Sequence, residues 1–386
     1  MKRQQDKKRK RAIVSVTNDL VTDQRVHKSC LALRKAGYAV LLVGRVRRQS
    51  PPMEERPYAT HRMRLLFGKG PLFYAEYNTR LFFYLLLHRA ALLFSNDLDT
   101  LLPNFFVSRL KGAELIYDSH EYFTETPELV NRPRVQKIWK GIEGFVLPKL
   151  DEMITVCDSI AALFEKKYGL KCHVVRNIPF RKALPEKGDR DALGLPAQKH
   201  LLVLQGSGIN IQRGAEELLQ SMQYLENCFL MIIGGGDVLP LLKRMTHDLQ
   251  LTDRVRFLPR MSYTRMMAYT QLADFGFCID KDTNLNYRYS LPNKLFDFIQ
   301  AGVPVIAAHL TEIEKIIRQY DLGLFIEDHR PETIARTIRE GLSDRECRER
   351  WKVNLALAAQ ELCWEKEEQR LLGILLRTGK AEVKNM

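Results

Sequence analysis

The chain has 386 residues, which is enough for two or three domains. Hydrophobic residues make up 45% and charged residues 27% of it, so collagen-like, fully disordered and disulfide-scaffold proteins are excluded. The formal net charge is +14, which indicates an anionic partner: nucleic acid, an anionic membrane surface or a phosphorylated small molecule.

Much of this charge lies at the N-terminus, where residues 2–11 hold seven basic residues and one acidic residue, or +6. The segment lacks the apolar stretch of a secretory signal. We expect residues 1–11 to form a basic tail that is simply solvated or attracted to anionic lipid, with nucleic-acid binding as a third alternative. Aromatic and basic residues farther along could extend such a membrane-facing patch: Phe67, Lys69, Phe73, Tyr77, Arg80 and Phe82.

The chain has no run of about 18 apolar residues, so we expect no transmembrane helix. Its seven cysteines are odd in number and include no Cys-x-x-Cys pair, which favours buried thiols in a reducing compartment over a zinc ribbon or a redox pair. The expectation is a cytoplasmic protein, with peripheral attachment to the inner face of the plasma membrane as an option.

Apolar strand patterns alternate with helical ones. Residues 12–16 and 39–43 are apolar throughout, as is typical of a parallel sheet covered on both faces, and a helical pattern with Val26, Cys30 and Leu33 lies between them. Further strands are predicted at 91–95, 114–117, 152–156, 200–205, 229–233, 254–258, 275–279 and 303–308, and a long helix at 345–376.

These elements predict two similar α/β halves, at 12–183 and 200–355, joined by a polar linker at 184–199 and followed by a helical segment at 356–386. Polar and glycine-rich residues gather where strands end, and open α/β sheets bind ligands at that edge. Two such halves would enclose a cleft suited to an anion.

A glycine-rich turn, Gly206-Ser207-Gly208, follows one predicted strand and leads to Arg213-Gly214 at the expected start of a helix. Backbone N–H groups and the positive helix end favour a phosphate there, and Arg213 could bind it through two hydrogen bonds. The segment is neither a Walker A loop nor a dinucleotide fingerprint, and a plain strand–helix loop is an equal alternative.

A second motif runs from Ser290 to Asp297 and predicts a helix with Ser290 as N-cap and Pro292 in its first turn. Lys294 and Asp297 are three residues apart and therefore share a helix face. The lysine could bind a phosphate and the aspartate the ribose hydroxyls of a nucleoside diphosphate. The alternative is a surface ion pair worth about 0.2–0.5 kcal/mol.

Taken in order, these motifs resemble the retaining GT-B glycosyltransferases of family 4, over about residues 12–375. The resemblance is carried by Gly206…Arg213-Gly214, Gly234-Gly235-Gly236, Val255–Tyr263 and Asp297…Ala301-Gly302-Val303-Pro304-Val305. It implies an α/β fold of GT-B type, in which two Rossmann-like doubly wound domains face each other across a cleft. The first domain would bind the acceptor and the second the nucleotide sugar, and the C-terminal helix would return to the first domain.

The resemblance also implies donor contacts. Arg213 stands in place of a family lysine on the donor diphosphate, and Ser207 where the family often has an arginine, for which Arg260 or Lys294 could compensate. Asp297 matches the acid that binds the ribose, but the family's other acid is replaced by Tyr289, which suits a different donor or weak activity. The predicted donor-binding residues are Gly206, Ser207, Arg213, Gly235, Arg260, Asn293, Lys294 and Asp297.

In the first half, His120 follows a predicted strand within Asp118-Ser119-His120-Glu121. It matches a family histidine near the transferred sugar, and a hydrogen-bonded structural histidine is the alternative. The candidate acceptor contacts are Asp23, Arg25, Glu121 and Glu125, of which the first two suit a solvated helix start equally well. The predicted catalytic residues are His120, Arg213 and Lys294.

The implied activity is transfer of a sugar, with retention, from a UDP- or GDP-sugar to a hydroxyl of a glycan or lipid-linked acceptor, in cell-surface polysaccharide or glycolipid synthesis. Cations would stabilise the leaving diphosphate, so neither a metal nor another cofactor is expected. The alternatives are a nucleotide-sugar epimerase of the same architecture and a non-catalytic nucleotide-sugar-binding protein. No helix-turn-helix, RRM or zinc-finger signature occurs, so nucleic acid is not an expected partner.

Overall fold

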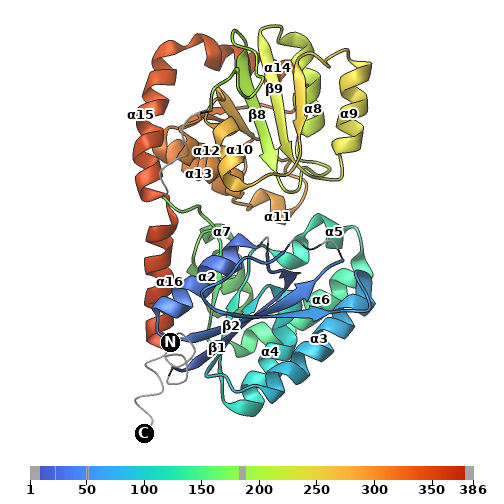
Figure 1. Cartoon of the computed structure of the whole chain (residues 1–386), viewed down its shortest axis with the longest axis vertical. Coiled ribbons are helices and arrows are strands. Elements are labelled where there is room, and N and C mark those ends of the chain that lie inside the picture. Colours follow the sequence, from blue (N-terminus) through green and yellow to red (C-terminus); the bar gives the residue numbers. More distant parts are fainter. Residues whose placement is uncertain (1–8, 22, 49, 51, 182–187, 379–386) are drawn as a thin grey trace. The chain divides into compact units, whose positions relative to one another are not determined.

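The computed structural model (Figure 1) describes residues 9–378 apart from 22, 49, 51 and 182–187. Most of the predicted basic tail, and residues 184–187 of the predicted linker, therefore lie outside the described residues. The chain divides into two compact units. Unit 1 comprises Met1–Asn177 and Lys366–Met386, and unit 2 comprises Ile178–Glu365.

Unit 1 is built on a parallel sheet with the strand order β3-β2-β1-β4-β5-β6-β7 in its described residues. The strand bounds are β1 Arg11–Asp19, β2 Ala39–Val46, β3 Ala59–Arg64, β4 Leu92–Asn96, β5 Glu114–Asp118, β6 Glu152–Thr155 and β7 Lys171–Val174. The direction in which strands are added reverses between β1 and β4. This switch point is where ligands bind in such sheets, outside the carboxyl ends of the strands.

Helices cover both faces of this sheet: α2 Gln24–Lys35, α3 Gly70–Leu87, α4 Leu98–Lys111, η2 Phe123–Glu125, α5 Pro127–Val130, α6 Pro133–Val146, η3 Leu147–Lys149, α7 Asp158–Tyr168 and α16 Trp364–Thr378. From β1 through α2 to β2 the chain moves along the sheet in one direction. From β3 through α3 to β4, and from β4 through α4 to β5, it moves in the opposite direction. Because such crossovers are right-handed, α3 and α4 lie on the face opposite to α2, as Figure 1 shows.

The C-terminal helix α16 packs on unit 1. Lys35 of α2 forms an ion pair with Glu368 of α16, with 2.6 Å between Nζ and Oε2. The backbone N–H of Arg176 donates to the carboxylate of Glu367 at 3.0 Å. The helix predicted at 345–376 is thus two helices, α15 Arg345–Glu361 in unit 2 and α16, which are separated at Leu362 and Cys363.

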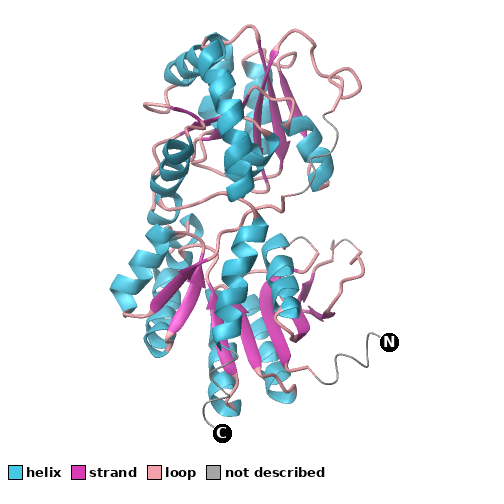
Figure 2. Ribbon diagram, turned by 90° about the vertical axis from the view of Figure 1, so that its left-hand side faces the viewer, coloured by secondary structure: helices cyan, strands magenta, loops and turns pink. Residues whose placement is uncertain are grey.

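Unit 2 repeats the same plan, with the strand order β10-β9-β8-β11-β12-β13 in a parallel sheet, and Figure 2 shows its strands flanked by helices. The strands are β8 His200–Gly206, β9 Cys228–Gly234, β10 Val255–Leu258, β11 Phe275–Cys278, β12 Val305–Ala307 and β13 Gly323–Phe325. The remaining helices are α8 Ala215–Ser221, η4 Met222–Tyr224, α9 Leu239–Asp248, α10 Tyr263–Thr270, α11 Leu285–Arg288, α12 Asn293–Ala301, α13 Thr311–Tyr320 and α14 Pro331–Ser343. The switch point here lies between β8 and β11.

The predicted α/β fold is confirmed, and a strand occurs at each predicted position. Three strands escape the sequence pattern: β3, β7 and β13. Each lies at the edge of its sheet and is only partly buried, so its residues need not form an apolar run. Five of the seven cysteines are buried, in agreement with the prediction: Cys30, Cys157, Cys228, Cys278 and Cys363.

Helix α3 corrects one prediction. Phe73 and Tyr77 were expected on a membrane-facing patch, but both are buried in a core cluster with Leu81 and Leu85, on one side of the helix. Their spacing of four residues places them on a single face, which packs against the sheet. Among the described residues, no helix combines the length and the apolarity needed to cross a membrane.

Glycine is required where the β9 backbone passes β8. Gly234 has a φ of +131°, and a Cβ there would lie 1.9 Å from the carbonyl oxygen of Gly206. We expect Gly234→Ala to lower the free energy of unfolding by at least about 2 kcal/mol. The control is Gly141→Ala in the middle of α6, where a Cβ meets no atom within 4 Å and helix propensity predicts a gain of about 0.5–1 kcal/mol. Urea unfolding of both variants measures this, and equal effects would contradict the close approach.

Candidate functional site

In unit 2, the loops after β8 and β9 pack tightly against each other at the carboxyl edge of the sheet. The N–H of Gly235 donates to the carbonyl of Gly206 at 3.1 Å, and the N–H of Ile209 donates to the carbonyl of Gly235 at 2.8 Å. Exposed Arg260 lies over Gly235 and donates to the carbonyl of Ser207 at 2.6 Å. The predicted donor residues of these two loops therefore form one contiguous surface.

Helix α8 begins where predicted, after Gly214. This glycine has a φ of +73°, and a Cβ on it would lie 2.4 Å from the carbonyl oxygen of Ile279. The close approach brings the loop that carries Arg213 against the end of β11. The guanidinium of Arg213 lies 4.9 Å from the centre of the Tyr287 ring, a cation–π distance that holds the side chain over α11.

Asp280 unites the two predicted catalytic cations of this unit. It follows β11, is 1% exposed, and lies 3.9 Å from Nη1 of Arg213 and 3.5 Å from Nζ of Lys294. Both separations exceed the roughly 2.7–2.9 Å of a charge-assisted hydrogen bond, and Oδ1 of Asp280 has no hydrogen-bond partner. The carboxylate thus attracts both cations to one place without holding their N–H groups in short hydrogen bonds.

Asp297 is oriented separately from Lys294. Its carboxylate accepts from the Tyr263 hydroxyl at 3.1 Å and from the Gln205 side-chain amide at 3.3 Å, and Gln205 in turn accepts from Thr270 at 2.7 Å. Burial, and then the charge of Asp297, raise the pKa of Tyr263. Lys294 and Asp297 are both 9% exposed, so the alternative of a solvated surface ion pair is wrong.

The start of α12 differs from the sequence prediction. Pro292, rather than Ser290, occupies the N-cap position, and α12 begins at exposed Asn293. The hydroxyl of Ser290 donates to the carbonyl of Tyr287 instead, at 3.0 Å, and thereby stabilises the turn after α11. Tyr289, where the family has an acid, forms the C-terminal cap of that short helix.

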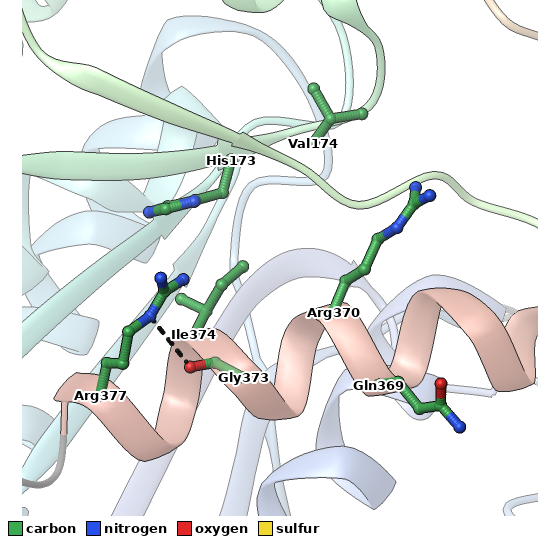
Figure 3. A pocket seen from close by; sticks show the side chains of 7 residues that line it. All are labelled: His173, Val174, Gln369, Arg370, Gly373, Ile374 and Arg377. Carbon is green, nitrogen blue, oxygen red and sulfur yellow. Dashed lines mark hydrogen bonds between the residues drawn. The ribbon is translucent and has the colours of Figure 1, made fainter.

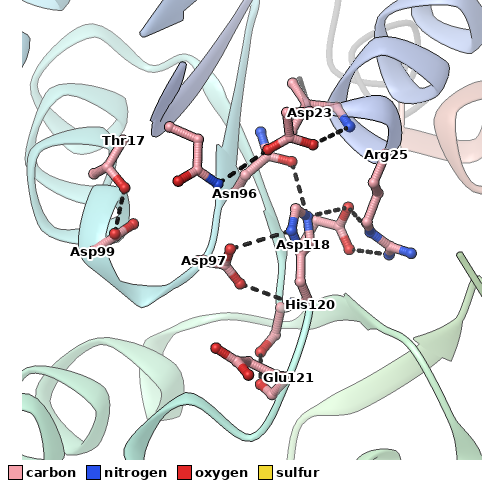
Figure 4. A network of polar contacts seen from close by, with 12 residues as sticks. Thr17, Asp23, Arg25, Asn96, Asp97, Asp99, Asp118, His120 and Glu121 are labelled. Carbon is pink, nitrogen blue, oxygen red and sulfur yellow. Dashed lines mark hydrogen bonds and ion pairs between the residues drawn. The ribbon is translucent and has the colours of Figure 1, made fainter. Parts of the chain in front are cut away.

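In unit 1, His120 is held between two carboxylates at the carboxyl ends of β4 and β5 (Figure 4). Its Nδ1 lies 3.2 Å from Asp97, and its Nε2 lies 3.3 Å from Asp118 and 3.2 Å from the side-chain oxygen of Asn96. Burial by itself disfavours the imidazolium, but the charges of Asp97 and Asp118 outweigh it and raise the pKa of His120 to about 10. His120 is therefore a cation and a hydrogen-bond donor at neutral pH, not a general base.

Arg25 completes this cluster from α2. Its guanidinium donates to both oxygens of Asp118, at 3.1 and 2.5 Å, and to the carbonyl of Val175 at 2.9 Å. Burial would raise the pKa of Asp118, but Arg25 and His120 lower it to about 2. Arg25 is 4% exposed, so the contacts seen here tie α2 to β5, and its predicted acceptor contact stays a prediction.

Asp99 lies beside this cluster and has a different character. It is 7% exposed, Oδ2 accepts from the Thr17 hydroxyl at 2.5 Å, and Oδ1 has no partner. Burial and the neighbouring charge of Asp97 raise the pKa of Asp99 to about 7. Asp97 itself has a φ of +57°, a strained value that its hydrogen bond from the His120 backbone N–H helps to maintain.

The other predicted acceptor contacts lie at the rim of the same edge. Asp23 caps α2 by accepting from the N–H of Val26 at 3.1 Å, as a helix start requires. Glu121 is partly exposed next to His120, and Glu125 in η2 forms an ion pair with Lys140 at 2.7 Å. No role toward an acceptor follows from these contacts alone.

Sequence reasoning missed Asp280, Asp99 and Gln205 as members of the two clusters. The signal that could have found them is a polar residue at the end of an apolar strand, directly after it or one turn beyond it.

A separate pocket of about 450 Å³ lies between β7 and α16 (Figure 3) and includes His173, Arg370 and Arg377. His173 lies 2.8 Å from Glu152, Arg370 pairs with Glu367, and Arg377 donates to the carbonyl of Gly373, so these three side chains have partners within unit 1.

Comparison with known proteins identifies the family. The profile described as "Glycosyltransferase Family 4" matches residues 24–179, and the profile described as "Glycosyl transferases group 1" matches residues 189–356. The two matches follow each other along the chain and together cover most of it. The chain therefore belongs to the group 1 glycosyltransferases and has the GT-B fold.

Individual relatives are distant. The D-inositol 3-phosphate glycosyltransferase of Jonesia denitrificans is 25% identical over 203 residues, which are 50% of this chain and 46% of that protein. The match thus spans just under half the length of that relative. Sucrose-phosphate synthase from Thermosynechococcus elongatus has a TM-score of 0.80 at 17% identity, over 97% of this chain and 100% of that one. HepE of Anabaena, in complex with UDP and glucose, has a TM-score of 0.68 at 14% identity, over 98% of this chain and 100% of that one.

Asp280→Asn tests the buried charge cluster of unit 2. Without the carboxylate, the ammonium of Lys294 stays buried without its anion, so we expect the free energy of unfolding to fall by at least about 2 kcal/mol. Asp282→Asn is the matched control, since Asp282 pairs with Arg288 on an exposed surface and should change stability little. Urea unfolding of both variants measures this, and similar effects would contradict the proposed importance of Asp280.

The raised pKa of His120 predicts a pH dependence. Its pairing with Asp97 and Asp118 stabilises the folded chain fully below about pH 6.5, the ordinary imidazole value, and this contribution is lost as the pH rises toward 10. The difference in unfolding free energy between wild type and His120→Gln should therefore be larger at pH 6 than at pH 10. An NMR titration of His120 with a midpoint near 6.5 would contradict the assignment.

Proposed function

We propose that this chain transfers a sugar from a nucleoside diphosphate sugar to a hydroxyl group of a glycan or lipid-linked acceptor. Unit 2 would bind the donor and unit 1 the acceptor. The observation that carries the proposal is Asp280, which gathers Arg213 and Lys294 beside the glycine-rich loops at the switch point of unit 2. Membership of the group 1 glycosyltransferases supports it.

A diphosphate leaving group suits these cations. As the bond to the sugar breaks, negative charge grows on the departing phosphate, and cations that are already in place stabilise it without reorganising. Arg213 and Lys294 would do this, while Asp297, oriented by Tyr263 and Gln205, would accept hydrogen bonds from the ribose. Since two cations supply the charge, we propose that no metal ion is needed, and transfer should persist in excess EDTA.

We further propose that the transferred sugar is a hexose and that its anomeric configuration is retained. The acceptor hydroxyl would then attack the face that the diphosphate leaves, and a phosphate oxygen would take its proton. His120, a cation at neutral pH, would donate hydrogen bonds rather than remove a proton. Product NMR distinguishes retention from inversion.

Two named relatives suggest which substrates to test first. The HepE structure contains UDP and glucose, so UDP-glucose is a first donor, with GDP-sugars as the second set. The name of the Jonesia protein suggests inositol phosphate as a soluble acceptor, and lipid-linked glycans test a role in polysaccharide or glycolipid synthesis. A non-catalytic nucleotide-sugar-binding protein is the second candidate, favoured by Tyr289 at the position of the family's other acid.

Arg213→Ala and Lys294→Ala test the catalytic proposal. Each should lower the turnover of sugar transfer by roughly 10²–10³-fold, the usual loss when one donor to a developing anion is removed. Asp297→Asn should mainly raise the donor KM. Exposed Lys352→Ala is the control and should retain wild-type turnover. Wild-type turnover in either cation variant, with the fold intact by circular dichroism, would refute the assignment. Binding without transfer or hydrolysis in the wild type would favour the non-catalytic candidate.

A further inference from the structure

Three helices of unit 1 expose large apolar side chains to solvent. Leu87 at the end of α3 is 81% exposed, Leu110 in α4 is 67% exposed and Ile138 in α6 is 64% exposed. Phe83, Phe106 and Phe145 on the same helices are also exposed. Helix α3 is thus apolar on two sides, because Phe73 and Tyr77 fill the core while Phe83 and Leu87 face water. Exposed apolar residues concentrated in this way mark an interaction surface.

These side chains belong to one continuous surface, which we call the α3–α4–α6 face. The ring centres of Phe106 and Phe145 are 6.1 Å apart, which joins α4 to α6. Lys111 of α4 donates to the carbonyl of Leu86 at 2.7 Å, which joins α4 to the end of α3. Figure 1 shows the three helices together on the side of the sheet away from α2.

The exposed charge of this face is mainly positive. Basic residues are exposed along it, and they include Arg80, Arg109, Lys111, Arg134, Lys137 and Lys140. The three helices, which are described in full, contain three acidic residues, and none of these is exposed. Asp99 and Glu143 are buried, and Glu76 pairs with Arg80 and accepts hydrogen bonds from the backbone N–H groups of Leu66 and Phe67. Lys140 pairs with Glu125 of η2.

Cations and apolar groups alternate closely within the face. Nζ of Lys149 lies 3.2 Å from the centre of the Phe145 ring, and Arg109 donates to the carbonyl of Lys149 at 2.7 Å. The rings and aliphatic stems could enter an apolar layer while the charged ends stay in a polar one. Anionic headgroups above hydrocarbon chains supply both layers.

We propose that the α3–α4–α6 face docks this chain on an anionic lipid membrane. The apolar side chains enter the boundary between headgroups and acyl chains, and the cations bind lipid phosphates. A second copy of the chain is a poorer occupant, because a symmetric contact would bring the same cations face to face. The inference does not rest on the proposed sugar transfer, since docking needs neither donor nor acceptor.

Vesicle cosedimentation of the full chain tests this proposal. Wild type should bind vesicles of phosphatidylglycerol and phosphatidylcholine at least tenfold more strongly than vesicles of phosphatidylcholine alone. The triple variant Leu87→Ser, Leu110→Ser, Phe145→Ser should lose at least tenfold in binding to the anionic vesicles. Its control is Val353→Ser, Leu357→Ser on α15, which removes two similarly exposed residues of unit 2 and should bind as wild type does.

A pair of charge reversals tests the electrostatic part. Arg134→Glu, Lys137→Glu on α6 should lower binding to anionic vesicles at least tenfold, whereas Lys243→Glu, Arg244→Glu on α9 makes the same change of net charge in unit 2 and should lower it less. If both pairs lowered vesicle binding equally, binding would depend on net charge alone and the proposal would be overturned. The proposal would also be overturned if the triple variant bound vesicles as strongly as wild type does. It would likewise be overturned if wild type formed a dimer in light scattering without lipid and the triple variant did not. Circular dichroism and melting temperatures confirm that each variant is folded.

Discussion

The site depends on a constraint of parallel sheets: all strands end at the same edge, and the chain must turn there. In unit 1 this edge collects Asp97, Asp118 and His120, and in unit 2 it collects Gln205, Gly206 and Asp280. The first set lies at the ends of β4 and β5, next to the point between β1 and β4 where the strand order reverses, and the second set lies at the corresponding point between β8 and β11. There the flanking loops separate and leave the strand ends open to a ligand.

Charge at these edges is stabilised in two different ways. In unit 1, both oxygens of Asp118 accept hydrogen bonds from Arg25, and His120 lies 3.3 Å from the same carboxylate, so Asp118 and Arg25 tie α2 to β5. In unit 2, Asp280 attracts Arg213 and Lys294 at the longer distances of 3.9 and 3.5 Å. The burial of Asp280 is costly unless a cation compensates, and this requirement keeps the two cations in place.

The sequence predicted the α/β fold because buried parallel strands are apolar runs, and the edge strands β3, β7 and β13 escaped because they are not. It indicated Arg213 and His120 because a glycine-rich turn or polar residues follow strands, and Lys294 because it shares a helix face with Asp297 in a motif that resembles that of the family. It could not show that Lys294 pairs with Asp280 rather than with Asp297, since that choice is made by side-chain packing between segments distant in sequence. The same limit explains Phe73 and Tyr77, whose aromatic character suits a membrane surface and a core equally well.

The structure also shows how the net charge of +14 is distributed over the described part of the chain. Part of it lies in residues 1–11, most of which are outside the described residues, part in the α3–α4–α6 face, and part around Asp280.

The central claim is that the cations around Asp280 bind a diphosphate. Isothermal titration of UDP, GDP and the corresponding nucleosides against wild type and Lys294→Ala tests it most directly. Wild type should bind one nucleoside diphosphate at least tenfold more tightly than its nucleoside, and Lys294→Ala should lose most of that difference while its affinity for the nucleoside is unchanged. A difference that survives in Lys294→Ala would contradict the account.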